Sequence, residues 1–475
     1  MAKKIYPEIE LTIESIGFEG VSIARHEGKV HFIQGGIPGD IVLASIHKNK
    51  SKYAEGTIKK VLRPGEGRKH PVCGHFGICG GCKWQHLEYE EQLLWKKSHV
   101  IDAFQRIGKI PFSHVFETLP SQQILHYRNK MEFSFGASRW LTAGEMNDDT
   151  IHRSFAIGLH IPGRFDKVLD IDECHIADSR NKQILALIRA KAHEMGITAH
   201  HAREHHGFLR NLIMRTAQNG TQCMIVLITS PTSTIQEEQF IEWYQTEFSK
   251  QISSITSQVW AVTESKSGVA VGDIYWTKGQ ESITEIINGV TFTISPFSFF
   301  QTNAVQLEPF ISTILSTAAI NQTDIVWDLY CGAGSITLPA AHRCKQIIGC
   351  ELSASSIQDA NKNKVANSIN NVEFYHEDLH KKNAIEKLMT FEKPDIIILD
   401  PPRAGIHEIL LQHLLTLESP KIVYVSCNPA TQARDCAILH EKYDVISLQP
   451  VDMFPHTYHV ENIALLQLRN HNEHN

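Results

Sequence analysis

Four short apolar runs in the last third of the chain constrain its fold more than any other feature. Each run is nearly continuous in Ile, Val and Leu, which is typical of strands buried on both faces of a parallel sheet. Segments compatible with helices separate the runs, so the sequence repeats a strand–helix–strand order. This order predicts an α/β domain over residues 281–475. The runs are DIVWDLY (324–330), QIIGCE (346–351), DIIILD (395–400) and KIVYVSC (421–427).

A glycine-containing turn follows the first of these runs. The chain reads Gly332-Ala333-Gly334 there, and the second run ends on Glu351. Glycines let a ligand approach the backbone, and an acidic residue at the tip of the second strand accepts hydrogen bonds from ribose hydroxyls. The longer GxGxxG pattern of dinucleotide sites is absent, whereas a short GxG with a strand-end acid is the arrangement used for S-adenosylmethionine. A tight turn that binds no ligand is the alternative.

Two consecutive strands are expected near the end of the chain, over residues 443–455 and 461–468. They are close enough in sequence to form an antiparallel pair. A hairpin that ends an otherwise parallel sheet is typical of the class I methyltransferase fold. The predicted fold class is therefore α/β, with a Rossmann-like class I domain that depends on S-adenosylmethionine.

The motif DPPR follows the third apolar run. Asp400 stands at the carboxyl end of its strand, where open α/β sheets bind ligands. Pro401 and Pro402 remove two N–H donors, so a rigid, non-helical lip is expected after the strand. In methyltransferases that modify adenine nitrogens an aromatic residue follows a related motif, but Arg403 follows here, which argues against amine methylation. A plain strand-ending turn is the alternative.

Three cysteines, Cys73, Cys79 and Cys82, lie close together with the spacing C-x5-C-x2-C. The N-terminus lacks the apolar block of a secretory signal, and no apolar run approaches the ~20 residues of a membrane span. We therefore expect a cytoplasmic protein whose thiols stay reduced, without a membrane partner. Clustered thiols in that setting indicate a metal site, and sulfur ligands select zinc or an iron–sulfur cluster. A fourth ligand is required.

The first part of the chain, residues 1–62, reads as short strands separated by glycines and polar turns, which predicts a small antiparallel barrel. The net charge of the whole chain is −6, yet Lys and Arg outnumber Asp and Glu over residues 1–70. An RNA-binding face should therefore include this part. The basic run HKNKSK (47–52) is a candidate contact, and a solvated loop is its alternative.

Residues 63–280 are expected to form a central α+β domain that begins with the cysteine cluster. The segment LEYEEQLLWKKSHVIDAFQRIG (87–108) predicts an amphipathic helix. The apolar residues that suit one face of this helix are Leu93, Leu94, Val100, Ile101 and Phe104.

Several motifs, taken together, resemble the RNA uracil-5 methyltransferases, which form 5-methyluridine in tRNA or ribosomal RNA. The motifs are DLYCGAGSITL, DPPRAGI, SCNPATQARD and DMFPHTYHVENIALL. The likeness extends upstream through SPFSFFQTN and the cysteine cluster to the N-terminal segment, which resembles the TRAM domain, an oligonucleotide-binding-type (OB-like) barrel. It is strongest to the 23S ribosomal RNA enzymes that carry both a TRAM barrel and an iron–sulfur cluster, because the tRNA enzyme typically lacks both.

The resemblance implies methylation of carbon 5 of a uridine in 23S ribosomal RNA by a covalent route. Carbon 5 is too weak a nucleophile to take a methyl group from a sulfonium, but addition of a thiolate to carbon 6 gives an enolate with electron density on carbon 5. The matching nucleophile is Cys427, and the matching base for the carbon-5 proton is Glu461. A nearby cation should lower the pKa of the thiol, and Arg434 or His456 are the candidates.

The resemblance also implies which residues hold S-adenosylmethionine. Asp378 would sit by the adenine, although an Asp after a strand is also an ordinary helix cap. Phe299 would stack on the target base, or belong to the core. The full set of expected cofactor residues is Gln301, Tyr330, Glu351, Asp378 and Asp400.

For the metal site, the resemblance supplies a distant fourth ligand, Cys174 in LDIDECHIAD. The C-x5-C-x2-C spacing differs from the paired C-x2-C knuckles of zinc ribbons, which favours a [4Fe-4S] cluster over zinc. The remaining cysteines Cys223, Cys344, Cys350 and Cys436 match no motif, and Cys331 lies in the glycine turn; none of these five is expected to be the nucleophile.

Other functions remain as alternatives. Arg128 and Lys130, on alternate positions of an expected strand, are candidates for phosphate contacts. The same chemistry on tRNA is one alternative, and a catalytically silent iron–sulfur protein that binds RNA is another. An iron–sulfur redox protein would need a GxGxxG or flavin signature, and neither is present. No obligatory protein partner is evident in the sequence.

Overall fold

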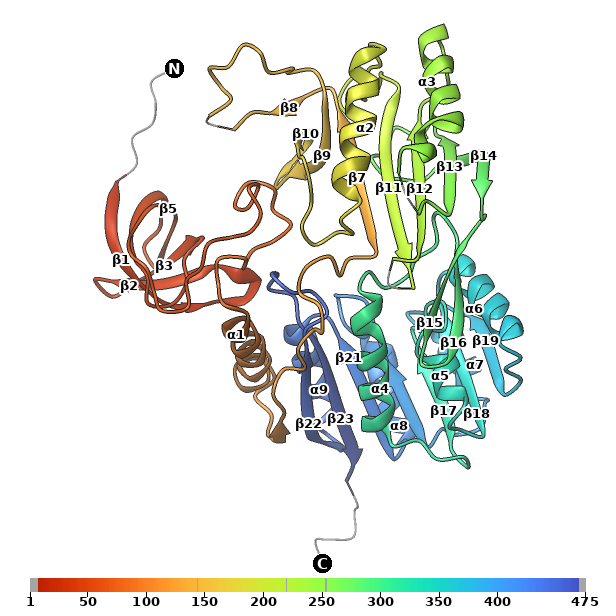
Figure 1. Cartoon of the computed structure of the whole chain (residues 1–475). Coiled ribbons are helices and arrows are strands. Elements are labelled where there is room, and N and C mark those ends of the chain that lie inside the picture. The colour runs from red at the N-terminus through yellow and green to blue at the C-terminus, as the bar shows by residue number, and fades with distance from the viewer. Residues whose placement is uncertain (1–6, 143, 219, 253, 470–475) are drawn as a thin grey trace, which may run out of the picture.

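The computed structural model describes residues 7–142, 144–218, 220–252 and 254–469. They form a closed barrel, two eight-stranded sheets and a two-stranded hairpin. In Figure 1 the barrel stands to one side, and the central sheet lies above the sheet of the C-terminal third. Residues 1–6 and 470–475, which belong to the first and third predicted domains, lie outside the described residues. No helix in the described parts of the chain is long and apolar enough to cross a bilayer.

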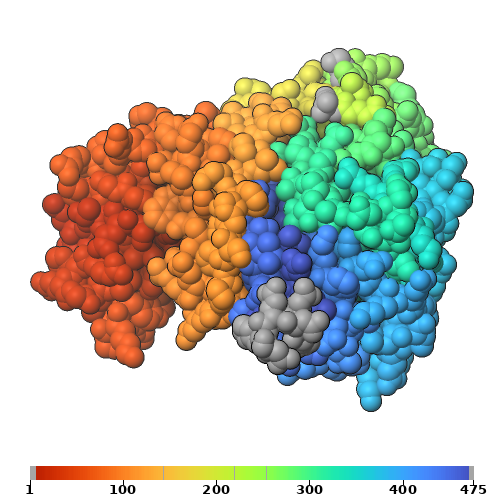
Figure 2. All heavy atoms as spheres, turned by 90° about the horizontal axis from the view of Figure 1, so that it is seen from below, coloured from red at the N-terminus to blue at the C-terminus, as the bar shows by residue number. Residues whose placement is uncertain are grey.

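The N-terminal strands close into a barrel in the order β1-β2-β3-β5-β4. Its small core contains apolar side chains such as Leu11, Ile33 and Val42, which point inward from alternate positions. The predicted small barrel is confirmed, although β3 and β5 pair in parallel. The space-filling view shows the barrel as one end of the molecule (Figure 2). The elements are β1 (Glu8–Ile16), η1 (Phe18–Gly20), β2 (Ser22–His26), β3 (Lys29–Gln34), β4 (Ile41–Asn49) and β5 (Tyr53–Arg63).

The central sheet has the order β14-β13-β12-β11-β7-β9-β10-β8. Alternate residues of β11 and β12 face two different cores: Leu212 packs with helices α2 and α3, whereas Ile213 packs with the hairpin and helix α4 of the C-terminal third. The sheet therefore joins two hydrophobic cores. Its elements are β7 (Lys130–Gly136), β8 (Arg139–Trp140), β9 (Ala156–Ile161), β10 (Arg164–Asp170), α2 (Asn181–Glu194), β11 (Leu209–Ala217), β12 (Gln222–Thr229), α3 (Ile235–Thr246), η3 (Phe248–Lys250), β13 (Ser257–Val262) and β14 (Asp273–Gly279).

The C-terminal sheet has the order β19-β18-β17-β20-β21-β23-β22-β6. The predicted apolar runs form parallel strands, and β22 and β23 form the predicted antiparallel pair. The strands are β17 (Ile325–Leu329), β18 (Gln346–Glu351), β19 (Val372–His376), β20 (Ile396–Leu399), β21 (Lys421–Ser426), β22 (Tyr443–Val451) and β23 (Glu461–Leu468). The helices are α4 (Ala304–Ala318), α5 (Thr337–Ala341), α6 (Ala354–Ala366), α7 (Lys382–Leu388), α8 (Glu408–Leu417) and α9 (Pro429–Leu439), and the hairpin is β15 (Ile283–Ile287) with β16 (Val290–Ile294).

The segment that connects the barrel with the central sheet differs from its prediction. Helix α1 (Tyr89–Asp102) continues as a π-helical turn, η2 (Ala103–Gly108), and β6 (Phe112–Val115) then joins the edge of the C-terminal sheet beside β22. Part of the predicted central domain therefore belongs to the C-terminal sheet. The buried face of α1 is also more polar than predicted, since Lys96 is fully buried whereas Leu94 is 54% exposed.

Candidate active site

A cavity of about 420 Å³ lies at the carboxyl ends of the parallel strands. Parallel strands bring their ends to one edge of a sheet, so residues far apart in sequence meet there. Phe299 lies at this cavity with 70% of its surface exposed, which leaves its ring free to receive a planar group. All the residues predicted to hold the cofactor line the cavity: Gln301, Tyr330, Glu351, Asp378 and Asp400.

The glycine turn beside β17 leaves room for a ligand. Gly332 and Gly334 both adopt positive φ angles, of 55° and 83°, which side chains rarely allow. A Cβ at Gly332 would meet no atom within 4 Å, whereas one at Gly334 would lie 3.1 Å from the ring of Phe374. The first glycine thus keeps the cavity open, and the second lets the turn pack against β19.

Glu351 is held in place by the backbone around it. One carboxylate oxygen accepts a hydrogen bond from the N–H of Gly332 at 3.1 Å, and the other accepts from the N–H of Ser353 at 2.8 Å. Burial, and then the charge of Glu351, raise the pKa of Asp400 to about 7. Two carboxyl groups on one cavity favour a positively charged ligand. The residues therefore fit a ligand that has ribose hydroxyls and a sulfonium.

Cys427 follows directly after β21 and is half-buried. The side chain of Asn428 accepts a hydrogen bond from the N–H of Ala430 at 3.1 Å, which starts helix α9, and donates one to the carbonyl of Arg403 at 3.1 Å. Because β20 and β21 are parallel neighbours, Cys427 and Asp400 lie at the same edge of the sheet. The turn after Cys427 thus keeps it beside the DPPR segment.

Glu461 is the first residue of β23, which runs antiparallel to β21. The register places Ser426 opposite Asn462, and continuing it by one residue brings Cys427 next to Glu461. Burial, and then the charge of Asp400, raise the pKa of Glu461 to about 8. The structure therefore brings the predicted nucleophile and the predicted base together, beside the cavity.

The surroundings of Cys427 favour the protonated thiol over the thiolate. Burial, and then the charge of Glu461, raise its pKa to about 11, while Arg403 acts to lower it. The prediction that Arg434 or His456 supplies this cation is wrong: the guanidinium of Arg434 bonds to Asp435 at 2.8 Å, and His456 is buried against other partners. Sequence reasoning missed this role for Arg403, although its place directly after Asp-Pro-Pro was a usable signal.

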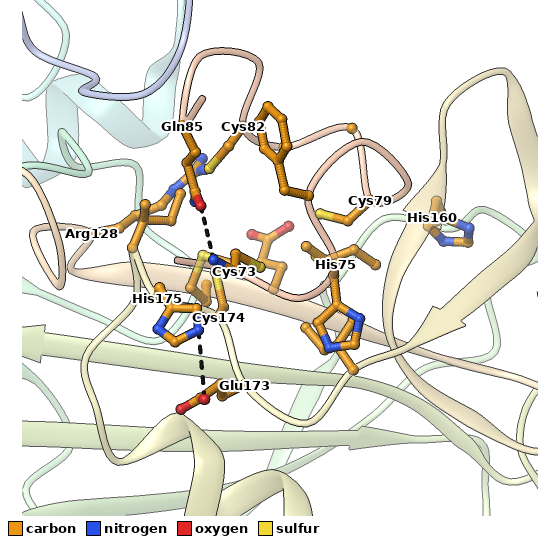
Figure 3. A pocket seen from close by; sticks show the side chains of 18 of the residues that line it. Cys73, His75, Cys79, Cys82, Gln85, Arg128, His160, Glu173, Cys174 and His175 are labelled. Carbon is orange, nitrogen blue, oxygen red and sulfur yellow. Dashed lines mark hydrogen bonds and ion pairs between the residues drawn. The ribbon is translucent and has the colours of Figure 1, made fainter. Parts of the chain in front are cut away.

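The four predicted metal ligands come from two separate segments and line a second cavity, of about 600 Å³. Figure 3 shows their side chains around one space, with those of Cys73 and Cys174 close together. Burial, and then the charges of the other cluster cysteines, raise the pKa of Cys82 to about 12, an effect that a bound cation would oppose. Four thiols are the ligand chemistry of zinc or an iron–sulfur cluster, although no three of their sulfur atoms lie within 4.8 Å of one another. The predicted ligands are Cys73, Cys79, Cys82 and Cys174.

The other five cysteines are buried, and Cys331 also lines the cofactor cavity. All of them are buried free thiols: Cys223, Cys331, Cys344, Cys350 and Cys436. Within the described residues, one group of three potential metal ligands has its ligand atoms within 4.8 Å of one another: His201, Glu204 and His206. Glu204 and His206 are exposed, and Glu204 accepts a hydrogen bond from His206 at 2.8 Å, so these two side chains already bind each other.

The two basic residues proposed for phosphate contacts also line the cysteine cavity. Only Lys130 belongs to β7, since Arg128 precedes the strand and forms an isolated bridge to Ala177. Lys130 forms an ion pair with Glu132 at 2.5 Å. The two side chains therefore lie beside the cluster, and an RNA contact through them remains a prediction.

Comparison with known proteins gives matches along the whole chain. Residues 288–469 match the model of the tRNA (uracil-5-)-methyltransferase family, and residues 4–59 match the TRAM domain. An uncharacterized RNA methyltransferase of Bacteroides thetaiotaomicron is 39% identical over 454 residues, covering 95% of this chain and 99% of the relative. One of Chlorobaculum tepidum is also 39% identical, over 97% of this chain and 96% of the relative.

Among solved structures, a tRNA (uracil-54, C5)-methyltransferase of Pyrococcus abyssi in complex with S-adenosyl-L-homocysteine matches with a TM-score of 0.74. It is 26% identical, and the match covers 96% of this chain and 100% of that one. The likeness therefore includes the barrel and the central sheet as well as the C-terminal sheet.

Proposed function

The chain belongs to the family of S-adenosylmethionine-dependent RNA uracil-5 methyltransferases, and from that premise we propose that it methylates a uridine of 23S ribosomal RNA through a covalent bond to Cys427. The observation that supports this proposal most is that Cys427, directly after β21, lies next to Glu461 at the start of the neighbouring strand β23. A nucleophile and a base side by side, next to a cofactor cavity, are what the reaction needs.

In the proposed reaction Cys427 is the nucleophile and Glu461 is the base. The thiolate of Cys427 adds to carbon 6 of the uracil, and the electron pair of the 5,6 double bond makes carbon 5 nucleophilic. S-adenosylmethionine, when bound, supplies the methyl group as an electrophile on a positively charged sulfur. Glu461 then accepts the proton of carbon 5, and the electrons of that C–H bond restore the double bond as the thiolate leaves carbon 6.

Electrostatics supports binding of the cofactor before the thiolate of Cys427 forms. Both Cys427 and Glu461 hold their protons more tightly than usual, because each is partly buried and lies near other acids. A cationic ligand beside Asp400 would oppose this effect and favour the thiolate. Arg403, which already lowers the pKa of the thiol, would stabilise the same charge.

Access to carbon 6 requires the uridine to leave its stack, since enzymes that do chemistry on a base take it out of the helix. We propose that the exposed ring of Phe299, which lies at the cavity, stacks on this base. The TRAM barrel, at one end of the molecule, is the proposed RNA grip.

The choice of RNA is the finer part of the proposal. The barrel together with the cysteine cluster favours 23S ribosomal RNA, on the family resemblance. The solved structure that matches over its whole length is a tRNA enzyme, so this architecture does not separate the two substrates by itself. A tRNA uridine is therefore the second candidate.

Methylation of two transcripts tests this choice. The protein is incubated with labelled S-adenosylmethionine and either unmodified 23S transcript or a mixture of tRNA transcripts, and the modified nucleotide is mapped. We expect label on carbon 5 of uridine in the 23S transcript. Label in tRNA alone would identify tRNA, and not 23S RNA, as the substrate. Label at another atom would overturn uracil-C5 methylation.

The cysteine cluster is proposed to hold [4Fe-4S], with zinc as the alternative. Protein prepared without oxygen should be brown and contain about four irons per chain, because four thiolates hold such a cluster. Cys82→Ser should lose the iron, whereas Cys223→Ala, which changes a buried cysteine outside the cluster, should keep it. A colourless protein that contains zinc would contradict the assignment.

A further inference from the structure

The loop that leads into Glu461 is held by the polar face of helix α1. This loop, residues 452–460, joins β22 to β23, and Glu461 is the first residue after it. The buried amide of Gln92 on α1 lies 3.2 Å from Nδ1 of His456, and its oxygen accepts a hydrogen bond from the N–H of His456 at 2.9 Å. His456 has a positive φ of 65°, a strained backbone angle that these bonds help to hold.

Lys96, one turn further along α1, is the charged part of this support. Its side chain is fully buried and forms an ion pair with Asp452, which is also fully buried. Its ammonium also donates to the carbonyl of Phe454 at 3.2 Å, and the hydroxyl of Tyr89 donates to the second oxygen of Asp452 at 2.9 Å. One lysine thus bonds to both ends of the segment Asp452–Phe454.

Stability alone is a poor reason for this arrangement. Taking two charges out of water costs several kcal/mol per ion, and apolar replacements of buried pairs are often neutral or stabilising. A buried pair can instead specify one conformation, and here the conformation it specifies is that of the loop before Glu461.

The charge of Lys96 also reaches Glu461 itself. Each group acts electrostatically on the other, and Lys96 favours the carboxylate form of Glu461. The charged and titratable groups around Glu461 come from four elements: Asp400 after β20, Arg403 in the following turn, Cys427 after β21 and Lys96 on α1. Those around Lys96 are Asp452 with its partner Tyr89, Glu461, and the imidazoles of His99, His456 and His459.

We propose that Lys96 is a positioning residue for the release step of the reaction: it fixes the 452–460 loop that sets Glu461 against Cys427, and its charge keeps Glu461 able to accept the carbon-5 proton. This inference rests on the proposed function. The same loop is also held from the cysteine-cluster side, since the N–H groups of Lys83 and Trp84, directly after Cys82, donate to the carbonyl of His456 at 2.8 and 2.9 Å.

The test compares Lys96→Met with the wild type in single turnovers with labelled S-adenosylmethionine and the RNA that the wild type methylates. The RNA–protein adduct is followed on denaturing gels between about pH 6 and pH 9. We expect Lys96→Met to form methylated adduct but to release it about tenfold to a hundredfold more slowly near pH 7, the size of a weakened general base.

The direction of the pH effect follows from the charges. Glu461 accepts a proton only as a carboxylate, so release rises as pH passes upward through its pKa. Loss of the Lys96 cation raises that pKa further, and the rising limb should move to higher pH. Lys96→Arg keeps the charge and should restore the wild-type pH dependence of adduct release, which a purely structural role would not predict.

One control and one substitute variant complete the test. Lys421→Met removes a half-buried lysine at the opposite end of β21, where its ammonium bonds the carbonyl of Ala318, and should leave adduct release unchanged. If Lys96→Met does not fold, the double variant Lys96→Met, Asp452→Asn, which leaves no buried charge unpaired, is measured in its place.

The outcomes separate the two proposals. A wild type that forms no 5-methyluridine would overturn the proposed function. A wild type that forms it, with a Lys96 or double variant that releases RNA at the wild-type rate and on the same pH limb, would overturn the role of Lys96. Loss of adduct formation in a folded variant would also overturn it, because the fault would then lie before the release step.

Discussion

Replacing Cys427 by alanine should abolish both methylation of the RNA and its covalent attachment to the protein. Without the thiolate no bond forms at carbon 6, so carbon 5 stays too weak a nucleophile to take the methyl group. Loss of a catalytic nucleophile typically lowers the rate by about 10⁴-fold or more. Methyl transfer to the RNA and adduct on denaturing gels are measured together, and both should fall to background.

The control for this variant is another cysteine of the same domain. Cys344→Ala removes a buried thiol in the turn between helix α5 and strand β18 and should keep adduct formation. Iron content should be the same in Cys427→Ala and the wild type, because Cys427 lies outside the cluster cavity. An adduct that still forms in Cys427→Ala would place the nucleophile elsewhere, with Cys331 in the glycine turn as the first rival.

The local patterns of the sequence predict the C-terminal domain because its strands are buried on both faces. Each continuous apolar run could only become an interior strand, and parallel pairing then sends every strand end to one edge. Asp400, Glu351 and Cys427 each directly follow or end such a run, so their meeting at this edge follows from the pattern. The distance along the chain between them does not matter once the sheet order is given.

The support of Glu461 could not be predicted in the same way. Lys96 and Asp452 are 356 positions apart, and nothing near either residue shows that the other will neutralise it. Helical periodicity predicted that one face of α1 is apolar and buried. The buried face of α1 packs against polar groups of the 452–460 loop, so Gln92 and Lys96 are buried there. Long-range polar pairing of this kind depends on the assembled fold.

Arg403 is an intermediate case. It directly follows Asp-Pro-Pro, where enzymes that methylate adenine nitrogens have an aromatic residue, so its identity argues against amine methylation. Its contribution to the thiol depends on the turn that brings its carbonyl within 3.1 Å of the Asn428 amide, next to Cys427. That contact joins the ends of two neighbouring strands, which the order of the motifs alone does not specify.

Glu461→Gln should separate the two halves of the reaction. The amide matches the carboxylate in shape but cannot accept the carbon-5 proton, so the thiolate of Cys427 should still add and the methyl group should still be transferred. Elimination should then stall, and a methylated RNA–protein adduct should accumulate, with release slower by about 10²- to 10⁴-fold. Denaturing gels and the mass of the digested adduct measure this directly.

The same substitution should change the thiol in the opposite direction. The charge of Glu461 raises the pKa of Cys427, so a neutral amide should lower it and let alkylation of Cys427 begin at lower pH. Release by the wild type should rise with pH around the Glu461 pKa of about 8, because the carboxylate is the active form above that value, whereas the slow release by Glu461→Gln should not follow this rise.

Glu441→Gln, which changes an exposed acid of the same domain, should behave as the wild type in both assays. If Glu461→Gln instead releases methylated RNA at the wild-type rate, the base must be another group, and Asp400, whose pKa is raised to about 7 at the same edge of the sheet, is the remaining carboxyl near Cys427. Faster alkylation of Cys427 in Glu461→Gln would support Glu461 as its neighbour. If no adduct accumulates in the same variant, Glu461 is not the base.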